Sequence, residues 1–251
     1  MAAWRGVAEA YRRSFGTLCA GTVDRMLADT PGRRHLDVGS GTGVLARRAA
    51  ALGRAVITVD ADAEMAALSR DAAPGRAVRA ALPVLPFDDA SVDAVTANFV
   101  VNHLADPRAG VLELARVLCA GGRMALTIWP AAPPTWSRIV EEAFTTVGLD
   151  PPSGTRLPPE KDIERSVDGL RALVGDIGLS VRVATELEWD WRVDPFDLWA
   201  GVSGGVATAG RAYRAQPPDV RARLDAAFRA RAGAHGGDLL LPSRAVYVVA
   251  G

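Results

Sequence analysis

Three glycines occupy alternate positions between an apolar run and a helical pattern. Gly39, Gly41 and Gly43 directly follow residues 35–38 (HLDV), and Val44 opens the next segment. Glycine lets the backbone turn sharply and approach a ligand closely, because a side chain there would obstruct the turn, the ligand or both. A strand, a tight glycine turn and a helix in this order predict a cofactor site at the turn.

An acidic residue ends the next β-branched run along the chain. Asp60 is the last residue of the segment 55–60 (AVITVD) and follows the glycine turn by about 20 residues. At this spacing in the sequence an acid can accept hydrogen bonds from both hydroxyls of a ribose. The glycine turn and Asp60 together predict a nucleoside site.

The spacing of the glycines disfavours two other nucleotide sites. A dinucleotide fingerprint reads G-x-G-x-x-G/A, but after Gly39 and Gly41 this chain has Val44 at the third glycine position, and its last glycine comes one residue early at Gly43. A phosphate-binding loop needs G-x-x-x-x-G-K-[ST], and no lysine follows this turn. A nicotinamide cofactor is therefore a weakened alternative, and nucleotide hydrolysis is excluded.

Aromatic side chains make up only 6% of the chain, but they gather in a few segments. Several of them could wall a pocket for an apolar or aromatic substrate. The candidates are Trp4, Phe15, Trp129, Trp199 and Tyr213. Trp129, before Pro130 at the end of a predicted strand, is the strongest of them. Trp189 and Trp191 stand two apart on a predicted strand, share one face and are expected in the core.

These candidate residues are positioned by alternating strands and helices. Strands are predicted over 35–38, 55–60, 78–82, 91–98 and 123–129, and helices over 44–52, 61–70 and 108–118. Such an alternation implies βαβ units and a parallel sheet that helices cover on both faces. The predicted fold class is therefore α/β.

Further elements flank this core. One amphipathic helix is predicted over Trp4–Leu18; later helices are predicted over 135–147 and 167–177, a long strand over 180–192, two helices within 195–233 and a last strand over 238–249. We expect a single domain over 1–251, with a helical cap at 1–30, a core at 31–194, a helical insert at 195–236 and the last strand at 237–251. An insert of ~40 residues is too short to build its own core, which favours a lid.

Composition excludes several classes of protein. Lys and Arg number 29 and Asp and Glu number 29, so no net charge draws the chain to nucleic acid or to an anionic membrane. No apolar run approaches the ~18 residues that span a bilayer, and no signal or transit pattern opens the chain. The expected location is the cytoplasm. Cys19 and Cys119 are too few for a disulfide framework or a zinc site, and we expect no metal.

At these residues the sequence resembles the class I S-adenosylmethionine-dependent methyltransferases. The resemblance lies in residues 35–43 (HLDVGSGTG), Asp60, residues 85–87 (LPF) and residues 121–123 (GGR), and it is greatest to the small-molecule branch of quinone biosynthesis and secondary-metabolite tailoring. It implies a Rossmann-like, seven-stranded, mostly parallel sheet with an antiparallel last strand, helices on both faces and a helical lid inserted between the last two strands. It also implies methyl transfer from S-adenosylmethionine to an O, N or C nucleophile of a small molecule, leaving S-adenosylhomocysteine.

The resemblance assigns a role to each matching position of the cofactor site. It places the glycines around the methionine and ribose parts, Asp37 at the turn or at the methionine amino group through water, and Asp60 at the ribose hydroxyls. It places Tyr11 over the methionine carboxylate. The full predicted set is Tyr11, Asp37, Gly39, Ser40, Gly41, Gly43, Asp60, Ala61, Met65, Ala81, Leu82 and Asn98.

The adenine end of that site departs from the family pattern. Ala61 and Met65 would pack on the adenine, the backbone of Ala81 and Leu82 would read its edge, and the Asn98 carbonyl would meet its amino group. The family often has an acid just after the third strand, where this chain has Ala80 and Ala81. We therefore expect backbone contacts and a somewhat weaker cofactor affinity.

His103 is the candidate general base. With Asn102, a candidate substrate contact, it follows the fourth predicted strand, at the sheet edge where the substrate cleft of this family lies. A histidine there could remove a proton from an attacking hydroxyl or amine; the alternatives are that it caps the next helix, hydrogen-bonds the backbone or orients the substrate. His35 lies inside the first strand, and His235 lies in a glycine-rich connection and is expected at the surface.

Several alternatives stay open at the level of sequence. Methylation of nucleic-acid bases is disfavoured, because residues 98–101 (NFVV) replace the [DNS]-P-P-[YFW] tetrad of such enzymes. The same cofactor site could serve a non-methylating reaction such as cyclisation, or a non-catalytic binding module. The expected partner is a small-molecule substrate, and the chain could be a monomer or a homodimer.

Overall fold

The chain forms two compact units. The computed structural model describes residues 4–73, 75–154, 157–233 and 236–251, so the prediction for His235 lies outside the described residues. Unit 1 consists of Met1–Gly21, Ala132–Thr155 and Trp189–Ser243, and unit 2 of Thr22–Ala131, Arg156–Glu188 and Arg244–Gly251. The predicted cap and the predicted insert thus fall largely in unit 1, and the glycine turn falls in unit 2.

Seven strands form one sheet in the order β3-β2-β1-β4-β5-β7-β6. They are β1 (Arg34–Val38), β2 (Ala55–Asp60), β3 (Arg76–Arg79), β4 (Val92–Asn98), β5 (Leu118–Ile128), β6 (Val181–Val193) and β7 (Leu239–Ala250). Strands β1 to β5 pair in parallel, whereas β7 pairs with β5 in antiparallel fashion. The predicted mostly parallel sheet with an antiparallel last strand is confirmed.

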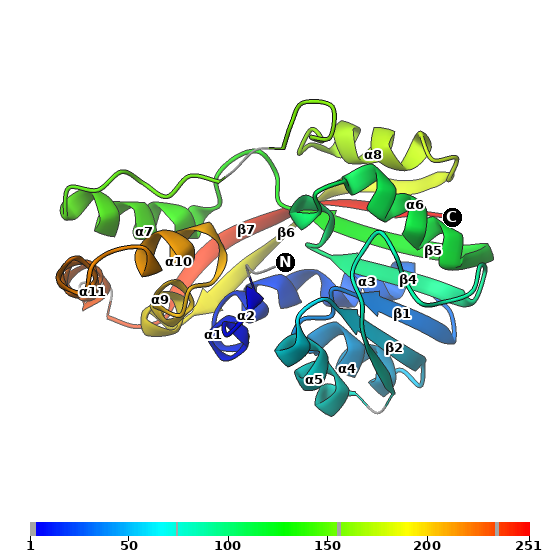
Figure 1. Cartoon of the computed structure of the whole chain (residues 1–251), viewed down its shortest axis with the longest axis horizontal. Helices are drawn as coiled ribbons and strands as arrows, with labels where there is room; N and C mark the ends of the chain where they lie inside the picture. The colour runs from blue at the N-terminus through cyan, green and yellow to red at the C-terminus, as the bar shows by residue number, and fades with distance from the viewer. Residues whose placement is uncertain (1–3, 74, 155–156, 234–235) are drawn as a thin grey trace. The chain divides into compact units, whose positions relative to one another are not determined.

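Helices cover both faces of the sheet in unit 2 (Figure 1). On one face, α6 (Pro107–Val117) and α8 (Val167–Gly175) join an apolar core with Leu36, Val95 and Leu126. On the other face, α3 (Val23–Asp29) and α4 (Val44–Ala51) pack around Ala125 and Tyr247, and α5 (Ala63–Ala72) contacts β2 and β3. Burial of both faces explains why these strands are rich in apolar residues.

Polar side chains interrupt the α3 and α4 face of the sheet. Successive strand residues point to opposite faces, so the neighbours of Leu36 and Val38 point toward α3 and α4. These neighbours include His35 and Asp37 of β1, with Thr96 of β4 opposite Asp37 in the register. All three are at least 98% buried, so each needs a hydrogen-bond partner inside the protein.

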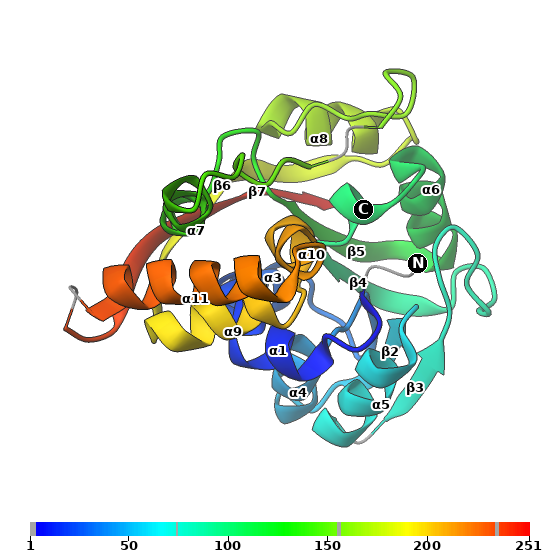
Figure 2. The same cartoon turned by 60° about the vertical axis from the view of Figure 1, so that its left-hand side comes forward.

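Unit 1 is built from helices around its own aromatic core. They are α1 (Ala8–Arg13), α2 (Phe15–Cys19), α7 (Thr135–Thr146), α9 (Pro195–Ser203), α10 (Ala207–Arg214) and α11 (Pro218–Gly233). Helix α9 contacts α1, α10 and α11, and Figure 2 shows α11 running beside α9. Trp199, Phe144 and Phe228 are buried where α7, α9, α10 and α11 meet. The helices α9 to α11 stand between β6 and β7 in the sequence, as expected for the insert.

Three element predictions need correction. The N-terminal helix is broken at Ser14, whose hydroxyl donates to the carbonyl of Ala10 at 2.6 Å and competes with the helical backbone. The insert holds three helices rather than two, because α9 ends before Gly205 at φ +89° and α10 ends before Pro217. The third strand covers 76–79 rather than 78–82.

Across residues 4–73, 75–154, 157–233 and 236–251, every helix is too short or too polar to cross a lipid bilayer.

Candidate functional site

The glycine turn is held open by backbone conformation and by its neighbours. Gly39, Gly41 and Gly43 all have positive φ, at +66°, +53° and +81°. A Cβ on Gly39 would lie 2.3 Å from the Val100 side chain, and a Cβ on Gly43 would lie 2.5 Å from Ala72. Positive φ and close packing thus both require glycine, which leaves the backbone of the turn between β1 and α4 bare.

Asp60 is hydrogen-bonded to this turn. Its Oδ2 accepts from the backbone N–H of Gly41 and its Oδ1 from the backbone N–H of Asp62, both at 2.9 Å. Burial of the carboxyl raises its pKa, while these hydrogen bonds act to lower the pKa. Each carboxylate oxygen has a second lone pair, so Asp60 can still accept from a ligand hydroxyl. The two predicted parts of the nucleoside site therefore meet.

Two buried oxygens beside the turn have no partner among the described residues. Asp37 is 2% exposed; its Oδ1 accepts from the Thr96 hydroxyl at 3.0 Å, but its Oδ2 accepts from nothing. The hydroxyl of Ser40, which is 9% exposed, is also unpartnered. Burial raises the pKa of Asp37 to about 7. Unsatisfied buried groups of this kind are what a bound polar ligand would satisfy.

The ends of β4 and β5 carry a polar and aromatic cluster. The amide oxygen of Asn98 accepts from the hydroxyls of Thr127 at 2.6 Å and Thr22 at 2.8 Å. Phe99 adopts a positive φ of +56° and stacks on Trp129, with ring centroids 3.8 Å apart. The strained Phe99 backbone is held by its N–H, which donates to the Thr127 hydroxyl at 2.8 Å.

His103 lies close in sequence to this cluster. It ends the short helix η3 (Val101–His103), which follows β4, and its side chain is exposed. The neighbouring Asn102 keeps a buried amide oxygen without a partner in the described part of the chain. This edge of the sheet thus offers a titratable group next to an unsatisfied acceptor.

The residues predicted at the adenine end show different degrees of exposure. Ala61 is exposed, whereas Met65 is 2% exposed within α5. Ala81 follows β3 and forms an isolated antiparallel bridge with Val84, and Leu82 is partly buried against the apolar core. Their roles remain predictions.

The other predicted contacts lie in unit 1. Tyr11 packs edge to face against Trp4, and Phe15 packs in the same way against Trp136 at 4.7 Å. Trp199 and Tyr213 are buried, and both donate to one oxygen of Asp225, at 2.8 and 3.0 Å. Packing and hydrogen bonds within unit 1 account for the burial of Phe15, Trp199 and Tyr213, so their assignment to a substrate stays a prediction.

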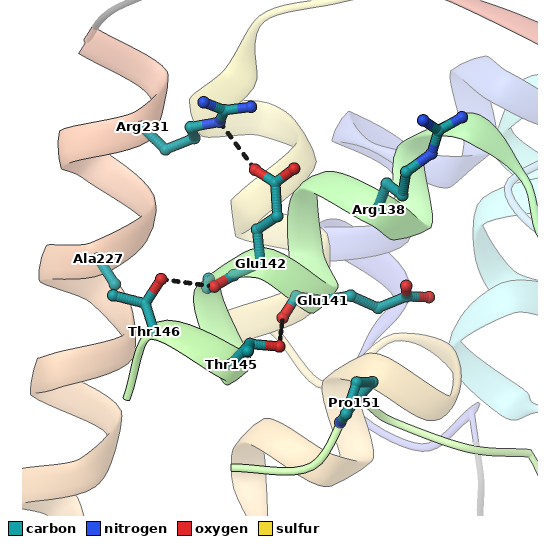
Figure 3. A pocket seen from close by; sticks show the side chains of 9 residues that line it. Arg138, Glu141, Glu142, Thr145, Thr146, Pro151, Ala227 and Arg231 are labelled. Carbon is teal, nitrogen blue, oxygen red and sulfur yellow. Dashed lines mark hydrogen bonds and ion pairs between the residues drawn. The ribbon is translucent and has the colours of Figure 1, made fainter. Parts of the chain in front are cut away.

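A pocket of about 590 Å³ opens within unit 1, between α7 and α11 (Figure 3). Its lining consists of Arg138, Glu141, Glu142, Ala143, Thr145, Thr146, Pro151, Ala227 and Arg231. Arg231 of α11 pairs with Glu142 of α7 at 2.9 Å, and the hydroxyls of Thr145 and Thr146 donate to backbone carbonyls one turn earlier. The pocket contains none of the residues predicted for cofactor or substrate.

Sequence reasoning missed some residues that the structure brings to the site. Thr96 and Thr127 bind the predicted residues Asp37 and Asn98, and Phe99 stacks on the predicted Trp129. The alternation of Thr96 and Asn98 in β4 was the available signal, since it places two polar groups on one face of a buried strand. No pattern signals the positive φ of Phe99. In the described ranges, no three His, Cys, Asp or Glu side chains converge as metal ligands.

Comparison with known proteins finds similar sequences around this site. Residues 36–126 match the family described as "Methyltransferase domain". A demethylmenaquinone methyltransferase from Clavibacter sepedonicus is 35% identical over 138 residues, which cover 51% of this chain and 56% of that protein. The chain therefore spans about half the length of the curated relatives that it matches.

Solved structures share the fold over a longer stretch. The YcgJ protein from Bacillus subtilis matches with a TM-score of 0.56 and 20% identity, over 93% of this chain and 97% of that one. The [4+2]-cyclase SpnF matches with a TM-score of 0.51 and 17% identity, over 93% and 80%. At such identities the likeness concerns the fold alone. The matching family spans the glycine turn and Asp60, and the strand order is the expected one, so the chain has the fold of the class I S-adenosylmethionine-dependent methyltransferases.

Proposed function

We propose that this protein transfers the methyl group of S-adenosylmethionine to an O, N or C nucleophile of a small organic molecule. The observation that carries the proposal is the set of unsatisfied buried oxygens beside the bare glycine turn, with Asp60 bound to that turn. The family match over residues 36–126 supports it.

The residues present fit the cofactor. S-adenosylmethionine carries an ammonium and a carboxylate at its methionine end and two hydroxyls on its ribose. The free Oδ2 of Asp37 can accept from the ammonium, the Ser40 hydroxyl can donate to the carboxylate, and Asp60 can accept from the ribose. The remaining predicted contacts, Tyr11 included, belong to the same proposal.

The chemistry needs little covalent help from the protein. Bound S-adenosylmethionine supplies a sulfonium that carries its own leaving group. The protein's part is to align the acceptor and to handle one proton, and alignment can supply much of the rate. His103 would take that proton, because it is an exposed imidazole beside the ends of β4 and β5. The unsatisfied amide oxygen of Asn102 would accept a hydrogen bond from the substrate that receives the methyl group.

The acceptor that this edge favours is an aromatic ring. Phe99 and Trp129 offer a stacked aromatic pair where β4 and β5 end, and aromatic walls bind flat apolar ligands. The name of the Clavibacter relative, a demethylmenaquinone methyltransferase, agrees with a ring of this kind. Quinone precursors and aromatic secondary metabolites both meet the description, and both belong in the substrate panel.

Thermal unfolding with S-adenosylmethionine, S-adenosylhomocysteine and NAD in parallel tests the cofactor. A ligand that binds only the native state raises the unfolding midpoint. We expect a rise with both adenosyl ligands and none with NAD; a rise with NAD alone would refute the cofactor and the reaction together.

Product mass tests the reaction. Incubation with S-adenosylmethionine and a panel of quinols, phenols and amines is expected to add one methyl group to an acceptor. An isomerised product of unchanged mass would instead support a non-methylating reaction, and binding without turnover across the panel would support a binding module.

A further inference from the structure

A chain of hydrogen bonds leads from α3 to Oδ1 of Asp37, beside the unpartnered Oδ2 of the same carboxyl. Nη1 of Arg54 lies 3.0 Å from Nδ1 of His35, and Nε2 of His35 lies 2.9 Å from the Thr96 hydroxyl. That hydroxyl lies 3.0 Å from Oδ1 of Asp37. His35 and Thr96 are fully buried. None of these contacts involves residues 39–43 of the glycine turn, so these hydrogen bonds need a separate explanation.

The direction of every hydrogen bond in this chain is fixed by chemistry. Arginine can only donate, so Nδ1 of His35 accepts and its proton sits on Nε2. Nε2 therefore donates to Thr96, whose own proton is left for Oδ1 of Asp37. Burial and the nearby charge of Arg54 lower the pKa of His35 to about 3, which keeps the imidazole neutral as this direction requires.

Arg54 is anchored at the far end of the chain. Its guanidinium donates to the carbonyls of Leu27 and Thr30, both at 2.7 Å, at the C-terminal end of α3. A cation at that end of a helix is stabilised by the helix dipole. The origin of the hydrogen-bond chain is thus fixed by a donor that cannot reverse.

We propose that Arg54, His35 and Thr96 are positioning residues that bind Oδ1 of Asp37 and reserve Oδ2 for the ammonium group of the cofactor. The inference rests on the proposed function. It follows that Oδ2 is also the one place on Asp37 where a proton can sit. The charge that acts on this carboxyl is that of Asp60 of β2, which raises the pKa of Asp37. The other titratable groups of the hydrogen-bond chain are the neutral His35 and the charged Arg54, which lie at its far end.

Cofactor binding then exchanges one cation for another at Oδ2. With a pKa of about 7, Asp37 holds a proton on Oδ2 in most free molecules at pH 6. The entering ammonium keeps its own protons and donates a hydrogen bond to Oδ2 of the carboxylate, so the carboxyl proton leaves to solvent. Binding at pH 6 should release close to one proton. At pH 8.5 the carboxyl has almost no proton left to release, and an α-amino group that is unprotonated in solution takes one up on binding.

Isothermal titration calorimetry with S-adenosylhomocysteine measures this exchange. Binding enthalpies in buffers of different ionisation enthalpy give the number of protons released at pH 6 and at pH 8.5. If the protein binds the ligand but releases no proton at pH 6, the inference is overturned and the proposed function stands. If it does not bind the ligand at either pH, the proposed function itself fails.

Thr96→Val tests the positioning role. The substitution keeps the shape of the side chain and removes the donor to Oδ1, so the pKa of Asp37 should rise by about one unit. Affinity at pH 6 should then fall about tenfold relative to the parent, whereas affinity at pH 8.5 should change less. The ratio of variant to parent at one pH cancels the titration of the ligand itself.

Thr58→Val is the matched control. Thr58 is a buried threonine opposite Asp37 on β2, but its hydroxyl pairs with Ser69 at 3.0 Å rather than with Asp37. The control should leave both the affinity at pH 6 and the proton count unchanged. Equal, pH-independent losses in the two variants would mean that Thr96 matters only for stability, and would overturn the inference.

Two substitutions of His35 keep the test decisive if Thr96→Val fails to fold. His35→Gln retains a donor toward Thr96 and an acceptor for Arg54, whereas His35→Leu removes both. We expect near-parent proton release and affinity in His35→Gln, and a loss of affinity at pH 6 larger than at pH 8.5 in His35→Leu. Identical behaviour of the two variants would refute a directional chain.

Discussion

Asp60 combines two roles in a single side chain. It accepts from the backbone of the glycine turn and retains lone pairs for the ribose. Asp60→Ala should therefore weaken the binding of S-adenosylhomocysteine by roughly 1.5–3 kcal/mol, the scale for losing a charged hydrogen-bond partner. Equilibrium titration measures the loss.

The neighbouring carboxylate provides the control for Asp60. Asp62 caps α5 by accepting from the backbone N–H groups of Glu64 and Met65. Asp62→Ala should lower the free energy of unfolding by about 1 kcal/mol and leave the affinity almost unchanged. Unaltered affinity in Asp60→Ala would remove Asp60 from the site.

His103 is the residue on which the proton-transfer step depends. His103→Ala should lower kcat by about 10²–10⁴, the usual contribution of a general base, with S-adenosylhomocysteine affinity preserved. Because the side chain is exposed, unfolding stability should change by less than about 0.5 kcal/mol. Steady-state kinetics with an identified methyl acceptor measures kcat, and an unchanged kcat would show that His103 is not the general base.

Site residues that form a local sequence pattern could be predicted from the sequence, but their buried hydrogen-bond partners could not. Gly39, Gly41 and Asp60 were predictable as a group, because a strand, a turn and a strand-end acid have fixed spacing. Thr96 lies 59 residues from Asp37, and its link to Asp37 depends on the pairing of β1 with β4. Local sequence carries no information about that pairing partner.

At the scale of an element, the turn between β1 and α4 packs closely against Val100, the residue before η3. Gly39→Ala places a Cβ 2.3 Å from Val100 at a φ of +66°. We expect a loss of about 1–2 kcal/mol from the left-handed backbone and a further 1–3 kcal/mol from the clash. Urea unfolding of the free protein measures the sum.

A second glycine separates these two contributions. Gly53 has a φ of +77° but nothing within 4 Å of its Cβ position, so Gly53→Ala should show the backbone cost alone. Adding Val100→Ala to Gly39→Ala should recover the portion that the clash causes. Equal losses of stability in Gly39→Ala and Gly53→Ala would show that the Val100 side chain can move aside without loss of stability.

Strand β1 carries two titrations that oppose each other. The pKa of His35 falls from 6.5 to about 3 on folding, and that of Asp37 rises from 3.8 to about 7, both chiefly because of burial. Between about pH 4 and 6.5 the unfolded chain holds a proton on His35, and the native protein holds one on Asp37. These two sites therefore bind the same number of protons in both states, and their joint effect on stability is nearly flat in this window.

Single substitutions should reveal each slope. In His35→Gln only Asp37 still titrates in this window, and the native state binds more protons than the unfolded chain. The free energy of unfolding, compared with that of the parent, should therefore fall by up to ~1.4 kcal/mol per pH unit as the pH rises from 4 to 6.5. In Asp37→Asn only His35 remains, and stability should rise with pH by a similar amount. Denaturant titrations at pH 4, 5 and 6 test this, and parallel curves for all three proteins would contradict it.

Elements with strong periodicity were predicted well, and those set by tertiary contacts were not. The run 55–60 and the helix that begins at Val44 match the structure because apolar spacing and glycine define them locally. The break at Ser14 combines a local hydrogen bond to Ala10 with tertiary packing, since a Cβ on Gly201 of α9 would touch the Ser14 side chain. Helix α10 was missed because it has only eight residues and its buried face holds a single large side chain, that of Tyr213.

On the scale of the whole molecule, composition and alternating pattern were enough for the fold class but not for the division into units. Unit 1 gathers Met1–Gly21, Ala132–Thr155 and Trp189–Ser243, three stretches distant in sequence. Their common core forms between helices that no local pattern links, such as α7 and α11. The predicted site residues divide accordingly: the cofactor set lies mostly in unit 2, and Trp4, Tyr11, Phe15, Trp199 and Tyr213 lie in unit 1.

Asp225 of α11 offers a way to test whether the two units open independently. One of its oxygens accepts from the buried Trp199 and Tyr213, so Asp225→Ala would leave two donors unsatisfied within unit 1 and cost about 2–4 kcal/mol. Asp225→Asn keeps an acceptor oxygen and should cost less. In hydrogen exchange, Asp225→Ala should lower the protection of α9 and α10 while amides of β1 and β4 keep theirs, because local opening is confined to the unit that loses its contacts. An equal loss of protection in both units would show instead that the chain opens as one cooperative body.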